Sequence, residues 1–117
     1  MNNSEIIKRF DEQEFVLATI DQITKDFLKV GIKLEFLPEH TQSAGSLIEY
    51  LNNELEIVMR EAPSLLTRLF YLVDIPETNI REIFDSSDLP SRDLADLLLL
   101  RAAQKVYFRE KYKSSSL

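Results

Sequence analysis

The stretch LPSRDLADLLLLRAAQKVYFREKYK, residues 89–113, decides the fold class of this chain. We predict one helix from about residue 90 to residue 113, because apolar side chains recur with helical spacing when projected at about 100° per residue. Two sides of this helix are apolar, which is typical of the central helix of a small bundle. One side comprises Leu94, Leu97, Leu98, Phe108 and Tyr112, and the other comprises Leu99, Ala102, Ala103 and Val106.

A proline-containing signal precedes this helix and also occurs fourteen residues earlier, since residues 74–76 (Asp-Ile-Pro) are echoed by residues 88–90 (Asp-Leu-Pro). Proline forces the residue before it out of the helical region and is well suited to the first position of a helix. We therefore predict that a helix starts at each proline. The period is too short for a helical solenoid, which needs about 33 or more residues per unit. We therefore interpret the repeated sequence as a signal for two helix starts and not as a repeat architecture.

Three further helices are predicted from apolar spacing and from helix stop signals. The first covers about residues 4–30, with a bend near residues 11–14, where polar side chains adjoin. The second covers residues 46–61, with Ser46 as its N-cap and with an apolar stripe of Leu47, Leu51, Leu55 and Val58. The third covers residues 64–73 and is apolar on most sides, which predicts deep burial.

The predicted fold class is all-α: a compact bundle of four or five helices with a largely buried C-terminal helix. We expect one helical domain, residues 1–113, followed by a frayed C-terminal tail, residues 114–117. Residues 32–36 alternate apolar and polar side chains, and no second segment does so. They form either an extended connector anchored by its apolar side chains or an edge strand that pairs with its copy in a dimer.

The formal charge of −6 at pH 7 is unevenly distributed along the chain. Residues 101–117 carry five bases and one acid, a net charge of +4, so residues 1–100 carry −10. The acidic total argues against general nucleic-acid binding, because contact with phosphates depends on Lys and Arg. The asymmetry marks either an interaction surface or a basic helix packed against an acidic body of the same molecule.

Composition also restricts the compartment. Cysteine is absent, which excludes disulfides, thiolate metal sites and cysteine nucleophiles. No apolar run approaches the roughly 20 residues of a membrane span, and the first residues, MNNSEIIKRFDEQE, carry acids where a signal peptide is apolar. We therefore expect a cytoplasmic protein without membrane contact, and its size and simplicity favour a bacterial source.

The chain has few residues from which a catalytic or metal site could be built. His40 is the only histidine and lies beside Glu39 in a predicted loop, while Gly31 and Gly45 are isolated from each other. One histidine is too few for the usual zinc sites, no serine lies in the motif of a nucleophilic triad, and isolated glycines do not form a phosphate-binding loop. We therefore expect no enzymatic activity, no catalytic or metal-binding residues, and no cofactor.

Four cations, Arg101, Lys105, Arg109 and Lys113, recur at every fourth position of the C-terminal helix with no acid among them. Together with Tyr112 they form the candidate interaction surface, which we call the basic stripe. The first two fall on an apolar face, where their stems would cover apolar surface or their charges would pair with acids of the same domain. The other interpretations are a docking site for an acidic partner and a contact with phosphate or nucleic acid.

Our leading hypothesis is a non-enzymatic protein–protein interaction module or a homo-oligomer subunit. The partner is then another protein or a second copy in a homodimer, and nucleic acid is not the expected partner. One alternative is a nucleic-acid-binding regulator that uses the basic helix of residues 101–113. Another is a small anionic-ligand-binding bundle that uses Arg101 and Lys105. The leading hypothesis predicts that Lys105→Glu or Arg109→Glu weakens partner binding and leaves the melting temperature nearly unchanged.

Overall fold

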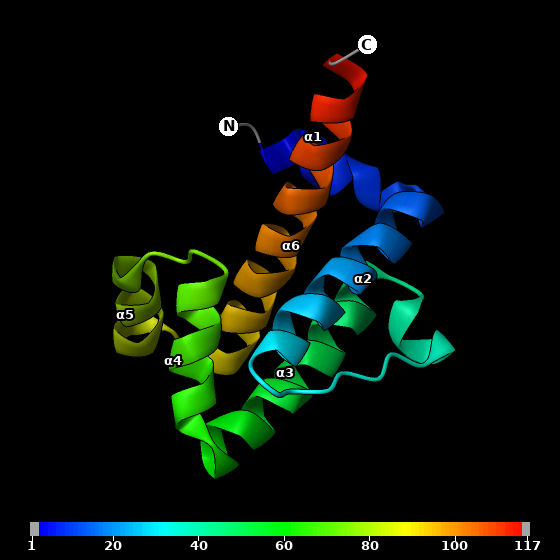
Figure 1. Ribbon diagram of the computed structural model, residues 1–117. Helices are drawn as coiled ribbons and strands as arrows, with labels where there is room; N and C mark the ends of the chain where they lie inside the picture. Colours follow the sequence, from blue (N-terminus) through cyan, green and yellow to red (C-terminus); the bar gives the residue numbers. More distant parts are fainter. Residues whose placement is uncertain (1–2, 116–117) are drawn as a thin grey trace.

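The helix predicted from residues 89–113 is α6 (Pro90–Ser115), which contacts four other helices. The computed structural model describes residues 3–115, with side chains to residue 113 (Figure 1). Its elements, in chain order, are α1 (Asn3–Lys8), the 3-10 turn η1 (Arg9–Asp11), α2 (Gln13–Lys29), the 3-10 turn η2 (Pro38–Thr41), α3 (Ala44–Glu61), α4 (Pro63–Leu72), α5 (Glu77–Ser86) and α6.

The all-α prediction is confirmed, because every regular element among residues 3–115 is helical and no strand occurs there. The predicted count of four or five helices is wrong for this part of the chain, which forms six α-helices. The difference arises within predicted helix 4–30. Glu12 adopts extended dihedral angles (φ −96°, ψ 118°), so the expected bend is a full break between α1 and α2.

The described chain is compact. Its Cα radius of gyration is 14.2 Å, close to the roughly 13 Å expected for a folded domain of this length. Helix α6 continues through Ser115, into the predicted frayed tail, whose last two residues lie outside the described part of the chain. The first two residues of the predicted domain lie outside it as well.

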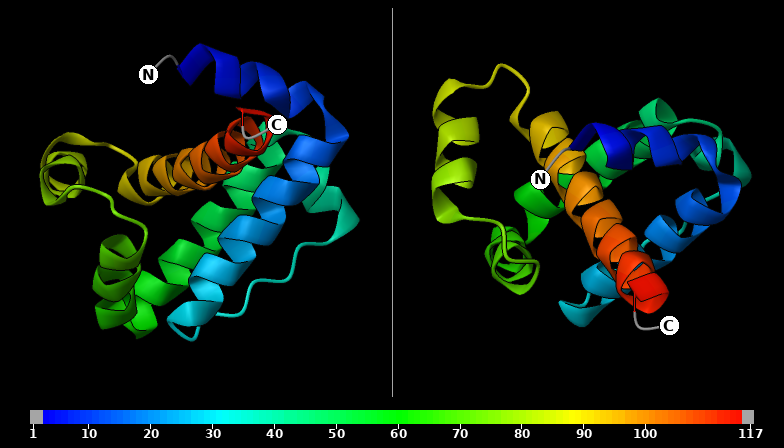
Figure 2. Two further views of the ribbon diagram at one scale, coloured as in Figure 1. Left: turned by 45° about the horizontal axis from the view of Figure 1, so that its top comes forward. Right: turned by 90° about the horizontal axis from the view of Figure 1, so that it is seen from above.

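The core forms where α2 and α3 pack against α6, and these are the most extensive helix contacts (Figure 2). The predicted apolar stripe of α3 is buried at each of its positions. In α6, both predicted apolar sides contribute buried residues as far as Val106, whereas Phe108 and Tyr112 are exposed. The buried apolar residues of these two helices are Leu47, Leu51, Leu55 and Val58 of α3 and Leu94, Ala95, Leu98, Leu99, Ala102, Ala103 and Val106 of α6.

Residues 32–36 form an extended connector without strand pairing in the described chain. Ile32 and Leu34 are buried, and the Tyr50 hydroxyl accepts a hydrogen bond of 2.7 Å from the backbone N–H of Glu35. The connector prediction is confirmed for the single chain, because side chains anchor the segment and Tyr50 of α3 satisfies part of its backbone. Pairing with a second copy stays a prediction.

Two helix starts differ from the prediction by a few residues. The N-cap of α3 is Ser43 and not Ser46, and the two serines form a reciprocal capping box with two hydrogen bonds of 3.0 Å. Pro90 is the first residue of α6, as predicted, but Pro76 stands one residue before α5, as its N-cap. The proline signal therefore locates both helix starts to within one residue.

The predicted deep burial of residues 64–73 is wrong for much of α4. Its sequence predicts deep burial, yet only Leu66, Leu69 and Phe70 of this helix are buried. The Tyr71 side chain is 88% exposed. The reason is that α4 packs on α2 and α3 with one side only. Its other side, with Ser64, Thr67, Arg68 and Tyr71, is exposed.

Candidate functional site

The first half of the basic stripe is engaged within the fold. The half-buried Arg101 donates from Nε to the carbonyl oxygen of Val73 at 2.8 Å. Nζ of Lys105 lies 3.1 Å from Oδ2 of Asp26, whose side chain is only 4% exposed. Gln22 donates to the other carboxylate oxygen of Asp26 at 3.0 Å. These contacts satisfy a buried charge and a backbone carbonyl, as stability requires of buried polar groups.

The second half of the basic stripe lies on the surface. The exposed Arg109 donates to Oε1 of Gln22 at 2.9 Å, and Lys113 is exposed as well. The Tyr112 side chain is 79% exposed. The five residues of the stripe therefore do not form one uniform surface, because the helix passes from the core to solvent between Lys105 and Arg109.

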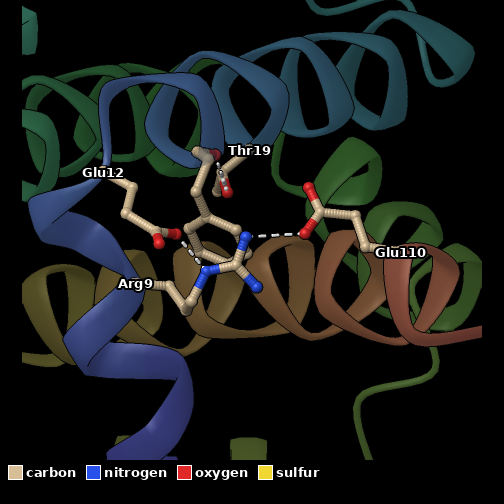
Figure 3. Close-up of polar contacts among 5 residues, drawn as sticks. Arg9, Glu12, Thr19 and Glu110 are labelled. Atoms are coloured by element: carbon tan, nitrogen blue, oxygen red, sulfur yellow. Dashed lines mark hydrogen bonds and ion pairs between the residues drawn. The ribbon is translucent and has the colours of Figure 1, made fainter. Parts of the chain in front are cut away.

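A second charged cluster, which the sequence analysis missed, joins the two ends of the described chain. The Arg9 guanidinium lies between the carboxylates of Glu12 and Glu110, and it donates to Glu110 at 2.7 Å (Figure 3). Its centre is 4.6 Å from the centroid of the Phe15 ring. The hydrogen bonds to Glu110 and Glu12 raise the pKa of Arg9. Because all its charges are paired and it adjoins the buried Phe15, we assign it a structural role.

An open apolar groove lies between α4 and α5. It has a volume of about 720 Å³, and its walls include Leu66, Phe70 and Tyr71 from the α4 side and Ile80 and Phe84 from the α5 side. No residue of α5 is buried, although its apolar side chains follow helical spacing. We call this feature the α4–α5 groove. Figure 2 shows α5 at the edge of the molecule, with a loop at each of its ends, and this helix contacts α6.

The segment that contains the α5 wall of this groove is acidic. The segment from Asp74 to Asp88 holds five acids and a single base, Arg81, which gives a net charge of −4. Arg81 forms an ion pair of 3.0 Å with Glu77, and Glu77 lines the groove. We call this segment, residues 74–88, the acidic rim, and Glu77 is the acid of this segment that lines the groove.

Part of the α4–α5 groove can be recognised from the sequence. The apolar face of α5 is visible as Ile80, Ile83 and Phe84. What sequence alone does not show is that this face opposes α4 across an open groove, because an apolar helix looks the same in a core and at a binding surface.

His40 and the acidic side chains show no arrangement typical of a metal site within residues 3–113. The ring of His40 stacks on that of Tyr50 with centroids 4.3 Å apart, and its Nδ1 accepts a hydrogen bond of 3.0 Å from the N–H of Leu37. His40 therefore holds η2 against α3. Within residues 3–113, no three acidic or histidine side chains are grouped as metal ligands would be.

None of the helices in residues 3–115 is both long enough and apolar enough to cross a membrane. Comparisons with protein families, with curated proteins and with solved structures gave no match for this chain. The geometry of the described residues is therefore the sole guide to function.

Proposed function

We propose that this chain is a non-enzymatic protein-interaction module that binds an amphipathic helix of a protein partner in the α4–α5 groove. The observation that carries the proposal is the apolar side of α5, where no residue is buried and from which Ile80 and Phe84 line the groove. Folding normally buries such a side, and large exposed apolar patches on single chains mark interaction sites. Here Tyr71 and Phe84, both large and exposed, stand on opposite walls of one groove.

The shape of the groove favours a helix as the ligand. Helices α4 and α5 have ten residues each, so each wall is about 15 Å long. A helix laid in such a groove inserts side chains spaced three and four residues apart, the usual mode of helix-in-groove recognition. The acidic rim selects for Lys and Arg beside those apolar side chains, because charge complementarity speeds association and disfavours acidic partners.

In this proposal α6 is the central, largely buried helix of a rigid bundle, and the groove lies at its periphery. The nucleic-acid and anionic-ligand alternatives have less support. Both depend on the cations of the basic stripe, and two of these, Arg101 and Lys105, have partners inside the fold. An anion would have to compete with the buried carboxylate of Asp26 for Lys105.

The test uses a labelled synthetic peptide of about 14 residues, long enough to span a wall of the groove, with leucines on one helical face and lysines on the other. Fluorescence anisotropy measures its affinity for the wild-type chain. A matched peptide with glutamates in place of the lysines serves as the charge control. We expect the lysine peptide to bind and the glutamate peptide to bind at least about tenfold more weakly.

Two variants locate the binding. Phe84→Ser removes an aromatic side chain from the groove and should weaken binding about tenfold, the usual effect of losing a buried anchor of this size. Leu17→Ser removes an equally exposed apolar side chain from α2, outside the groove, and should leave the affinity unchanged. Equal losses in the two variants, or equal affinity for the two peptides, would refute the proposed function.

A further inference from the structure

The last described turns of α6 carry a short amphipathic surface of their own. They project beyond α1 (Figure 1). Phe108 and Tyr112, which lie on these turns, are 42% and 79% exposed. At about 100° per residue, these two aromatic residues lie about 40° apart on the helix. Lys111 lies about 60° to one side of Phe108 and Arg109 about 100° to the other. Glu110 lies on the opposite side, where it pairs with Arg9.

This surface has the chemistry that the α4–α5 groove selects. Its two aromatic side chains stand four residues apart, the spacing of anchors in helix-in-groove recognition. Residues 107–113 carry three bases and one acid, a net charge of +2, whereas the acidic rim, residues 74–88, carries −4. The exposed segment is about 10 Å long, which fits within the roughly 15 Å length of the groove walls.

We infer that the ligand of the α4–α5 groove is the C-terminal end of α6 from a second copy of this chain, with Phe108 and Tyr112 as the inserted side chains. This inference rests on the proposed function and names its partner. The two surfaces are different parts of the chain, so each copy both offers a groove and supplies a helix end. Contact between two grooves is disfavoured, because it would bring two rims of −4 together.

The interface is small. Two aromatic side chains bury roughly 150–250 Å² each, well below the roughly 1,200–2,000 Å² of a stable complex. We therefore expect reversible self-association in the micromolar to millimolar range, weakened by salt because oppositely charged surfaces meet. Sedimentation velocity on the full chain, from about 10 µM to about 1 mM, measures the association.

Two double variants test the two surfaces of the contact separately, one in the groove and one at the helix end. The groove variant Tyr71→Ser/Phe84→Ser and the helix-end variant Lys111→Glu/Tyr112→Ser should each be monomeric across this range. Mixed together they should form a 1:1 complex, because the helix-end variant keeps its groove and the groove variant keeps its helix end. Wild-type association that neither variant reduces, or a mixture that stays monomeric, would overturn the inference.

A second variant, which changes the charge of the acidic rim, covers the case in which removing both aromatic side chains unfolds the chain. Glu82→Lys/Asp85→Lys changes two exposed side chains, brings the net charge of residues 74–88 from −4 to 0, and should weaken self-association about tenfold. Unchanged association in this variant would also count against the inference. If the lysine peptide binds the groove while the wild-type chain stays monomeric at about 1 mM, the proposed function stands and this inference fails.

Discussion

The ion pair between Lys105 and Asp26 gives a direct test of whether the basic stripe is structural or functional. Replacing Lys105 with methionine keeps most of the apolar stem and removes the charge that lies 3.1 Å from Oδ2 of Asp26. The carboxylate of Asp26 then stays buried with one remaining hydrogen bond, from Gln22. Removing one member of a buried ion pair costs about 3–5 kcal/mol, because the other charge is left without a partner.

The lower end of that range applies here. The Lys105 side chain is 25% exposed, so the pair is not fully screened from water, and Gln22 still satisfies part of Asp26. We therefore expect Lys105→Met to lower the free energy of unfolding by about 3 kcal/mol. An unfolding entropy of about 2.1 cal/mol/K per residue converts this to a fall in melting temperature of roughly 12 °C.

The double variant Asp26→Asn/Lys105→Met sharpens the test. The asparagine keeps the shape of Asp26 and can still accept a hydrogen bond, but it carries no charge, so the double variant should be about 1–2 kcal/mol more stable than Lys105→Met alone. Urea unfolding followed by circular dichroism measures all three proteins. A Lys105→Met protein as stable as wild type would refute this reasoning and restore the interpretation of Lys105 as a surface for a partner.

The remaining predictions concern the core, a cap and one titrating group. Leu51→Ala, at a fully buried position of α3, should cost about 2–5 kcal/mol in urea unfolding, whereas a cost below about 1 kcal/mol would mean that α3 is not central to the core. Ser43→Ala removes the N-cap of α3 and should lower the melting temperature by roughly 4 °C, with the exposed Ser64→Ala as an unchanged control. Burial raises the pKa of Tyr50, so its phenolate should form above pH 10, the approximate pKa of a free tyrosine. The stability that the neutral hydroxyl contributes should be complete below about pH 10 and should be lost as the pH rises through the raised pKa. An ultraviolet difference titration of wild type against Tyr50→Phe measures this, and a pKa at or below about 10 would contradict it.

The sequence predicts the parts of this fold that depend on neighbouring residues. The apolar stripe of α3, the proline at the start of α6 and the interruption near residues 11–14 all follow from local spacing and backbone preference. The cap of α3 is placed wrongly, because both Ser43 and Ser46 suit an N-cap and spacing alone does not choose between them.

Features that join distant parts of the chain could not be predicted in the same way. Lys105 and Asp26 are 79 residues apart, and Arg9 and Glu110 are 101 apart, so no local pattern pairs them. The groove is a similar case, because its two walls are individually visible as apolar faces. Whether such faces pack together or stay open depends on how the loops around residues 73–76 and 87–89 orient α5.

The most direct test of the central claim is a map of where a basic amphipathic helix binds this chain. Backbone amide shifts of the isotope-labelled protein, recorded while the leucine–lysine peptide is added, give this map residue by residue. We predict that the largest changes fall on α4 and α5, around Phe70 and Ile80, and that the core of α3 and α6 is unaffected. Changes confined to the basic stripe of α6, or spread evenly over the surface, would contradict the assignment of the α4–α5 groove as the binding site.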